Sequence, residues 1–436
     1  MLPAAFLERM RAQLGSEFEA FHAALLEPRT NAVRVNTLKL EVAALEALLG
    51  ATFERVPWLP EGLYVPYTLR LGAHALHHAG AYYVQEASAQ AVARALMPQP
   101  GERVLDLCAA PGGKSTHLAA LMRNQGVFVA NEPVPNRARV LAENLERLGV
   151  RGAVTQEEPQ ALADAWGETF DRVLVDAPCS GEGMFRKSET AVREWSPGLV
   201  AMCARRQATI LERAAALLRP GGTLVYSTCT FAVEENEDTV SRFLGAHPEF
   251  VLEEIPTLPR GLNSIGSRLM PHVVRGEGHF VARLRKAGSA VLEVVDAPST
   301  RGEKLWRAFA AEFGLENETA VEFRNEVQLV QPGTPSLEGL RAVRAGVPAA
   351  SVHKDRLEPH HALSHLLDAA HTLDLELNDP RVAAYLRGET LESGGQAGWV
   401  AVRAAGLALG WGKRVGATVK NHYPKALRGQ TVVLED

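Results

Sequence analysis

Short apolar runs alternate with amphipathic stretches between residues 103 and 286, and this pattern constrains the fold most strongly. Two of the runs, RVLVD (172–176) and TLVYST (223–228), predict strands that are buried on both faces. Further strands are predicted at 103–107, 127–132 and 278–286, and helices at 136–149 and 205–218. Strands that alternate with helices in this way predict an α/β fold with a doubly wound, Rossmann-like parallel sheet.

A cysteine follows each of the two buried strands. Cys179 lies in DAPCSGEG, three residues after Asp176, and Cys229 lies in YSTCTF. The carboxyl ends of parallel strands face one crevice, where ligands bind. We therefore expect both thiols and the Asp176 carboxylate at one edge of the sheet, with nucleophilic chemistry as their function. Cys203 is interpreted as a small apolar residue, the usual state of a lone buried cysteine.

A glycine-rich turn, DLCAAPGGKST (106–116), follows the first strand and opens a helix. It approaches the phosphate-binding pattern GxxxxGK[ST], but Cys108 replaces the first glycine and Pro111 has no backbone N–H. A nucleotide triphosphatase is therefore the weaker alternative. Glu132 ends the next strand, where an acid suits the two hydroxyls of a ribose. An adenosine ligand without a pyrophosphate fits both features, and S-adenosylmethionine is the common one.

The composition is that of an ordinary soluble globular protein, with 46% hydrophobic and 22% charged residues. Four cysteines in 436 residues do not make a secreted disulfide framework, so we expect a cytoplasmic chain with reduced thiols. No Cys/His cluster has zinc-site spacing, and no apolar run has membrane-spanning length, so neither a metal nor a membrane is expected. The net charge of −5 argues against indiscriminate polyanion binding.

The two thiols and Asp176 suit methyl transfer to carbon 5 of a cytosine. Carbon 5 is a poor nucleophile, but a thiolate that adds to carbon 6 turns it into an enamine carbon that attacks a methyl sulfonium. A carboxylic acid near N3 would donate the proton that stabilises the adduct. One thiol would add and the other would help elimination or release, and spacing alone does not say which. The motif DPPY, usual for methylation of an exocyclic nitrogen, is replaced by DAPC.

The chain resembles the Nop/Sun family of RNA cytosine-C5 methyltransferases and, within it, looks like the bacterial RsmF type that acts on 16S ribosomal RNA. The segments that carry the resemblance extend over nearly the whole chain. They are RVNTLK (34–39), AGAYYVQEASAQ (79–90), VLDLCAAPGGKSTHLA (104–119), ANE (130–132), DAPCSGEGMFRK (176–187), YSTCTFAVEENE (226–237), RLMPHVVRGEGHF (268–280) and GWGKRVGATVKNHYPKALR (410–428).

The resemblance implies a role for each matching residue. Cys229 would be the nucleophile, Cys179 would help release the product, and Asp176 would be the acid near N3 of the base. The cofactor S-adenosylmethionine would be held by Glu132, Asp176 and the turn formed by Cys108, Ala109, Ala110, Pro111, Gly112, Gly113 and Lys114. Many members place an acid after the third strand for the adenine amino group. Here Gln156, Glu157 and Glu158 occupy that stretch, and the contact is left unassigned.

The same comparison predicts the domain organisation. Residues 1–79 would form an auxiliary RNA-binding α/β module, 80–286 the methyltransferase domain, 287–300 a linker, and 301–436 a PUA-like RNA-binding domain with a helix at 360–370.

The target base must leave its stack to reach the thiols, so single-stranded or loosely paired RNA is the expected substrate. Basic residues in three regions are predicted to contact it. They are Arg34 and Lys39, then Arg186 and Lys187 with Arg205 and Arg206, and finally Lys413, Lys420, Lys425 and Arg428, which interleave with Trp411, His422 and Tyr423.

We therefore expect a monomeric rRNA methyltransferase that binds ribosomal RNA or the small ribosomal subunit. A transfer-RNA substrate within the same family is the nearest alternative. A ribosome assembly factor that retains the fold without catalysis is another, and the presence of both thiols argues against it.

Overall fold

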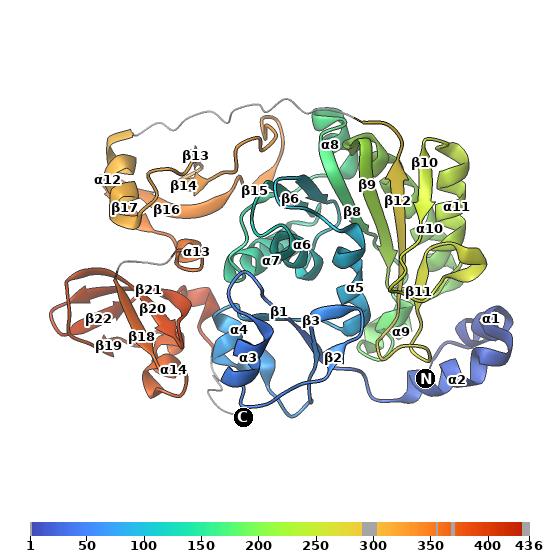
Figure 1. The fold of residues 1–436 in the computed structure, drawn as a ribbon, viewed down its shortest axis with the longest axis horizontal. Helices are drawn as coiled ribbons and strands as arrows, with labels where there is room; N and C mark the ends of the chain where they lie inside the picture. Colours follow the sequence, from blue (N-terminus) through green and yellow to red (C-terminus); the bar gives the residue numbers. More distant parts are fainter. Residues whose placement is uncertain (1, 290–302, 355, 368–370, 430–436) are drawn as a thin grey trace.

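The computed structural model describes residues 2–289, 303–354, 356–367 and 371–429. These residues contain four β-sheets: one near the N-terminus, a large central one, and two in the C-terminal third (Figure 1). The predicted linker, 287–300, lies almost wholly outside the described residues.

The N-terminal module is an antiparallel sheet with helices around it. The strand order is β2-β3-β1-β4, where β1 is Ala32–Val35, β2 Arg55–Val56, β3 Leu59–Tyr64 and β4 Tyr82–Val84. Because β4 pairs with β1, this sheet extends beyond the predicted boundary at residue 79. The helices are α1 (Ala4–Leu14), α2 (Phe18–Leu26), α3 (Val42–Leu48) and α4 (Ala75–His78).

Helices α1 and α2 lie below the central sheet in Figure 1 and carry an aromatic cluster. Phe6 packs edge-on against Phe185, and Phe21 packs edge-on against Phe231. Phe185 follows Cys179 in the chain, and Phe231 follows Cys229. Through these two contacts, α1 and α2 pack against the loops that carry Cys179 and Cys229.

The central sheet has the order β10-β12-β9-β8-β5-β6-β7-β15, with β11 paired to β12. The five strands β9, β8, β5, β6 and β7 are parallel, as predicted. Strands β12 and β15 pair antiparallel with β9 and β7, and β10 and β11 pair antiparallel with β12, so the complete sheet is mixed. The strands are β5 (Arg103–Asp106), β6 (Val127–Asn131), β7 (Ala153–Thr155), β8 (Phe170–Asp176), β9 (Leu218–Thr228), β10 (Phe250–Glu253), β11 (Ser267–Leu269), β12 (His279–Lys286) and β15 (Ala342–Arg344).

Helices cover both faces of this sheet, and each face has its own apolar core. Side chains of α5 (Ala87–Leu96), α6 (Gly113–Leu121) and α7 (Pro135–Arg147) form one core with alternate strand residues. Side chains of α8 (Pro159–Trp166), α10 (Pro197–Leu217) and α11 (Glu237–Ala246) form the other. This is the predicted doubly wound arrangement, and it places the carboxyl ends of the parallel strands at one edge. Helix α9 (Glu189–Glu194) lies in the loop after β8.

The C-terminal third, predicted as one domain, contains two sheets. One has the order β13-β14-β16-β17, and the other the order β18-β20-β21-β22-β19. The predicted helix at 360–370 is the single turn α13 (His361–Ser364), and residues 368–370 lie outside the described part. The remaining elements are α12 (Glu303–Phe313), β13 (Ala320–Phe323), β14 (Glu326–Leu329), β16 (Val347–His353), β17 (Arg356–Pro359), β18 (Thr372–Leu375), α14 (Pro380–Arg387), β19 (Leu391–Glu392), β20 (Gly398–Ala404), β21 (Leu407–Val415) and β22 (Thr418–Asn421).

Candidate active site

The glycine-rich turn connects the end of β5 to the start of α6. Gly112 precedes the helix with a φ of +112°. A Cβ at this position would lie 3.2 Å from Leu141 Cδ1, in a backbone conformation that side chains rarely adopt. The turn therefore needs glycine here to bring the backbone close to α7.

Three side chains from other elements hold this turn by its carbonyl groups. Asn144 donates to the Pro111 carbonyl at 2.9 Å, and Arg137 donates to that of Ala110 at 3.0 Å. From β1, the buried Arg34 donates to the Gly113 carbonyl at 3.1 Å and to Thr116 Oγ1 at 2.7 Å. The N-terminal module is thus bonded directly to the turn.

Glu132 follows β6 and is only 2% exposed. Its carboxylate accepts a hydrogen bond from the Val134 N–H at 3.0 Å and pairs with Arg137 at 3.2 Å. Each carboxylate oxygen has two lone pairs, so acceptor capacity remains for a hydroxyl-bearing ligand.

Glu132, Asp176 and both cysteines line one cavity of about 350 Å³. The glycine-rich turn, the loop after β6 and the loops after β8 and β9 all contribute to its wall. The lining residues are Leu107, Cys108, Ala110, Glu132, Pro133, Val134, Arg137, Glu158, Pro159, Asp176, Ala177, Pro178, Cys179, Gly181, Met184, Arg206, Ile210 and Cys229. The strand-end prediction therefore holds for the thiols, the carboxylate and the turn.

The thiols of Cys179 and Cys229 are in contact, with Sγ atoms 3.4 Å apart. Hydrogen bonding to Cys229 and burial raise the pKa of the Cys179 thiol well above its usual value. Because a thiol with a raised pKa stays protonated, Cys179 is suited to donate a proton to its neighbour. Burial also raises the pKa of Cys108, which packs against the core of the α8, α10 and α11 face, as expected for a structural residue.

A buried carboxylate, Glu235, ties the two cysteine loops together. It accepts hydrogen bonds from the backbone N–H and hydroxyl of Ser180 and from Gln207 Nε2. Ser180 in turn bonds Thr230 across the two loops, with their hydroxyl oxygens 2.8 Å apart. Burial raises the pKa of Glu235 to about 7, although these donors oppose the shift. The sequence spacing gave no signal for this contact between positions 180 and 235.

A second buried carboxylate, Glu182, joins the same loops to α1. It accepts from Arg9 at 2.6 Å, from the Trp195 indole at 2.8 Å and from the Phe231 N–H at 2.9 Å. Glu182 is 0% exposed, and its partner Arg9 is 22% exposed. Together with Glu235 it fixes the backbone on both sides of the thiol pair.

Asp176 ends β8 between two basic side chains, Lys114 and His279. Its Oδ2 is 2.8 Å from Lys114 Nζ, its Oδ1 accepts from Ser227 Oγ at 2.7 Å, and His279 Nε2 is 4.0 Å from Oδ1. Burial opposes ionisation, but Lys114 and His279 outweigh it and lower the pKa of Asp176. The carboxyl is therefore ionised at neutral pH. The Ser227 and His279 contacts were not predicted.

Asp106 lies beside Asp176, at the end of β5, and its pKa is shifted in the opposite direction. It is fully buried, and Ser115 Oγ donates to its Oδ2 at 2.6 Å. Burial, reinforced by the charge of Asp176, raises the pKa of Asp106 to about 7. The two neighbouring carboxyl groups therefore have different pKa values, and Asp176 is the one that is ionised.

Several basic residues predicted to contact RNA instead bond other parts of the protein. Arg34 is only 1% exposed and bonds the glycine-rich turn. Lys39 donates to the carbonyls of Ala79 and Arg147, at 2.6 and 2.9 Å. Arg186 pairs with the buried Glu277 at 2.8 Å and bonds two backbone carbonyls. These side chains hold segments together, and we assign them a structural role.

The basic C-terminal residues predicted to contact RNA differ in their exposure. Lys420 and Lys425 are exposed, whereas Lys413 is half-buried, with its Nζ 5.1 Å from the centre of the Trp399 ring. Arg428 is also half-buried and bonds the Tyr423 carbonyl. Trp411 and Tyr423, predicted to stack on bases, are instead core residues with 2% and 3% exposure. Their aromatic rings fill the cores of the two C-terminal sheets.

Three further sequence predictions concern the cavity rim. Lys187 is half-buried, and its charge helps to lower the pKa of Glu86. Arg206 lines the cavity, whereas Arg205 does not. In the unassigned stretch after β7, Glu158 lines the cavity, and the Glu157 carboxylate pairs with Arg341 at 2.8 Å.

Among the described residues, no group of three or more His, Cys, Asp or Glu side chains is placed to hold a metal ion. Within the same ranges, none of the helices combines the length and hydropathy needed to cross a bilayer.

Family models match the chain in four consecutive parts. The N-terminal domain of 16S rRNA methyltransferase RsmF matches residues 2–87, and 16S rRNA methyltransferase RsmB/F matches residues 93–285. The RsmF first C-terminal domain matches residues 308–367, and the methyltransferase RsmF PUA domain matches residues 372–429. The last two matches coincide with the two C-terminal sheets.

Two solved structures from Pyrococcus horikoshii are similar to the chain. A methyltransferase homologue is 34% identical with a TM-score of 0.57, and the match covers 65% of this chain and 94% of that chain. NSun6 with SFG is 26% identical with a TM-score of 0.60, and the match covers 66% and 99%.

Curated relatives match almost end to end. Ribosomal RNA small subunit methyltransferase F of Cronobacter sakazakii is 36% identical over 98% of this chain and 96% of its own length. The protein of that name from Vibrio vulnificus is 34% identical over 98% and 97%. With four consecutive domain matches and relatives that match almost end to end, this chain belongs to the RsmF family of 16S rRNA methyltransferases.

Proposed function

We propose that this enzyme methylates carbon 5 of a cytosine in 16S ribosomal RNA, through a covalent bond between a cysteine thiol and carbon 6 of the base. One observation carries the proposal. Two thiols in contact, 3.4 Å apart, line the same cavity as Asp176, whose pKa is lowered, and Glu132. Methylation of an exocyclic nitrogen has no use for a pair of thiols, whereas carbon-5 methylation needs one to attack and benefits from a second.

In this reaction Cys229 adds as a thiolate to carbon 6, and carbon 5 becomes nucleophilic. Asp176 lies at the end of the neighbouring strand β8, where it can hold the N3 edge of the base and pass a proton to N3. Cys179, whose thiol keeps its proton, then assists elimination of Cys229 from carbon 6 and release of the product. These roles for the two cysteines follow the family resemblance and agree with the raised pKa of Cys179.

The residues around the cavity fit S-adenosylmethionine, which would supply the methyl group. Glu132 offers carboxylate acceptors for the ribose hydroxyls, and Asp176 offers a negative charge to the cationic part. The turn from Cys108 to Lys114 would hold the methionine part, with its backbone fixed by Arg34, Arg137 and Asn144.

The substrate assignment is supported by the relatives and by the C-terminal PUA match. We propose that ribosomal RNA or the small ribosomal subunit is the partner, that the enzyme acts in the cytoplasm, and that it acts as a monomer. Among the predicted RNA contacts, Arg205, Arg206, Lys420 and Lys425 are exposed, and Lys187 is half-buried.

The test is a methyl-transfer assay with labelled S-adenosylmethionine and small-subunit RNA or subunits from cells that lack this protein. Wild type should place the label in 5-methylcytosine, and Cys229→Ala should place none. Cys203→Ala is the matched control, because Cys203 lies in α10 and does not line the cavity. Label in transfer RNA alone would reject the ribosomal substrate. Label in another base, or full activity of Cys229→Ala, would reject the chemistry.

A further inference from the structure

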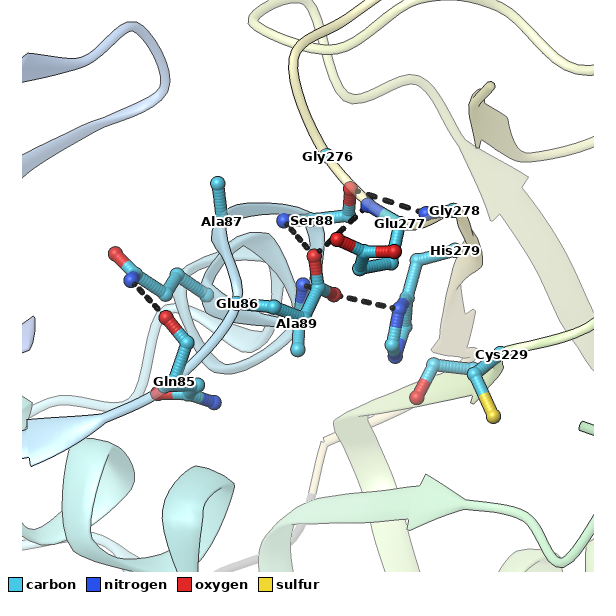
Figure 2. Close-up of polar contacts among 12 residues, drawn as sticks. Gln85, Glu86, Ala87, Ser88, Ala89, Cys229, Gly276, Glu277, Gly278 and His279 are labelled. Carbon is cyan, nitrogen blue, oxygen red and sulfur yellow. Dashed lines mark hydrogen bonds and ion pairs between the residues drawn. The ribbon is translucent and has the colours of Figure 1, made fainter. Parts of the chain in front are cut away.

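His279, the first residue of β12, is buried between two carboxylates that come from different elements. Its Nδ1 is 3.3 Å from Glu86 Oε1, and its Nε2 is 4.0 Å from Asp176 Oδ1. Figure 2 shows the imidazole between the Glu86 carboxylate and Cys229. His279 does not line the cavity, so it can influence the reaction only through a neighbour that does.

Glu86 is fixed in place as the cap of helix α5 (Figure 2). Its Oε1 accepts from the Ala89 N–H at 2.5 Å, and its Oε2 accepts from the N–H groups of Ser88 and Glu277, at 2.9 and 3.1 Å. Although burial opposes ionisation, His279 and these bonds lower the pKa of Glu86 to about 2. Glu86 is therefore a permanent anion that orients the ring and favours a proton on Nδ1.

The proposed reaction needs a proton that Asp176 does not hold. Its pKa is lowered, so the carboxyl is ionised before the base arrives. Lys114 is nearer, at 2.8 Å, but the charge of Asp176 overcomes burial and raises the pKa of Lys114, which makes it a poor proton donor. Imidazoles exchange protons near neutral pH and are the usual relay groups in proteins.

We propose that His279 is a positioning residue that supplies this proton through Asp176, an inference that rests on the proposed function. As the Cys229 thiolate bonds to carbon 6, the electron pair of the carbon 5–carbon 6 double bond shifts toward N3. N3 takes a proton from Asp176, and Asp176 takes one from Nε2 of the His279 imidazolium, which keeps its Nδ1 proton beside Glu86. Carbon 5 is then methylated, with the methyl group that S-adenosylmethionine would supply. On elimination, carbon 5 loses its proton to a base, the thiolate leaves carbon 6, and the N3 proton returns through Asp176 to His279.

The separation of 4.0 Å between Nε2 and Oδ1 exceeds a hydrogen bond. Catalytic hydrogen bonds are often longer before the substrate binds, and one water molecule bridges such a gap. A base that binds Asp176 from the cavity side would reorient the carboxylate, which Ser227 and Lys114 hold at hydrogen-bond distance.

Other charged groups around the pair bear on its titration. Lys187 acts on Glu86 from the loop after β8, and Lys114 of α6 acts on Glu86 and Asp176. Glu277, two residues before His279, is neutralised by Arg186 at 2.8 Å. Asp106, beside Asp176 at the end of β5, has a pKa that burial raises to about 7, and the thiol of Cys229 lies on the loop that follows β9.

The experiment measures single-turnover methylation of small-subunit RNA from pH 5.5 to 9 with His279→Gln, whose amide can donate a hydrogen bond but cannot relay a proton. We expect the wild-type rate to fall on the alkaline side, and the variant to lose that dependence along with about 10²-fold in rate at neutral pH. The KM for RNA and the affinity for S-adenosylmethionine should change by less than about threefold, a split that a purely structural role does not produce. If thermal melting shows that His279→Gln does not fold, His279→Asn, which keeps a donor for Glu86, replaces it with the same expectation.

His247→Gln is the matched control, because His247 also lies between two carboxylates, Glu212 and Glu249, at the far edge of the sheet. A folded His279 variant with the wild-type rate and pH profile would overturn the relay. A lower rate with an unchanged pH profile would overturn it too and leave a structural role. Both outcomes differ from failure of the proposed function, in which wild type itself makes no 5-methylcytosine.

Discussion

Lys39 Nζ lies 3.1 Å from His365 Nδ1, at the place where the N-terminal module, the catalytic domain and the C-terminal third meet. Lys39 also donates to carbonyls of Ala79 and Arg147, so one side-chain amino group contacts all three parts. Nearby, His78 Nδ1 lies 3.0 Å from the Tyr423 hydroxyl. The contact is therefore rich in buried histidines, and protonation should weaken it.

Stability should decrease in acid because of these histidines. Burial lowers the pKa of His77 to about 2, of His78 to about 4 and of His361 to about 3, and it lowers that of His365 well below its usual value. In the unfolded chain each has a pKa of about 6.5. Below pH 6.5 the unfolded chain therefore binds protons that the folded protein does not, and the free energy of unfolding decreases.

The expected slope is at most about 1.4 kcal/mol per pH unit for each histidine. Urea unfolding of the full chain at pH 7.5, 6.5, 5.5 and 5.0 measures it. His361→Gln should reduce the slope, whereas His22→Gln, on the first helical pair, should leave it unchanged. A free energy of unfolding that is constant from pH 7.5 to 5.0 would contradict this account.

Arg34 should matter for cofactor binding although it lies in another module. Arg34→Met removes the donors to Gly113 and Thr116 and leaves buried acceptors without partners, a loss of about 1–3 kcal/mol. We expect a lower melting temperature and affinity for S-adenosylmethionine reduced by about tenfold, measured by calorimetry. Arg29→Met, at an exposed position of the same module, is the control. Cofactor affinity within twofold of wild type would show that the turn holds its shape without Arg34.

Arg34 also shows where sequence reasoning stops. The central strands, the glycine-rich turn and the meeting of Cys179 with Cys229 were predictable, because strand periodicity and the strand-end rule depend on local pattern. Tertiary packing decides whether an arginine contacts solvent or bonds a carbonyl 79 residues away. The position of the arginine in the sequence does not indicate which of the two occurs. The contact between Ser180 and Glu235 was hidden for the same reason.

Aromatic residues in basic segments were a second source of error. Trp411 and Tyr423 alternate with lysines in sequence, which suggested stacking on bases, but they point into the C-terminal cores. A β-strand presents alternate residues to opposite faces, so an aromatic residue beside a lysine is as compatible with a core as with a binding surface. Lys420 and Lys425 are exposed, and the hypothesis of RNA binding rests on them.

RNA binding should therefore depend on Lys420 and Lys425. Deleting residues 301–436 would also remove β15 from the catalytic sheet, so charge reversal in the full chain is the cleaner test. Lys420→Glu with Lys425→Glu should weaken RNA binding by about tenfold and reduce the slope of log affinity against log salt by about 2, while cofactor affinity stays unchanged. Arg260→Glu, exposed on the catalytic domain, is the control. An unchanged slope of log affinity against log salt would mean that RNA does not contact these two lysines.

Cys179→Ala should trap the enzyme on its product. Cys229 would still add to carbon 6, but the neighbouring Sγ at 3.4 Å, which holds its proton because its pKa is raised, would be missing when the thiolate has to leave. We expect an RNA–protein adduct that survives denaturation and appears as a slowly migrating band in a denaturing gel, with turnover reduced by about 10²-fold or more. The double variant Cys179→Ala with Cys229→Ala should form no adduct. If Cys229→Ala trapped RNA and Cys179→Ala did not, the two thiols would exchange roles, and the proton-holding thiol would be the one that attacks.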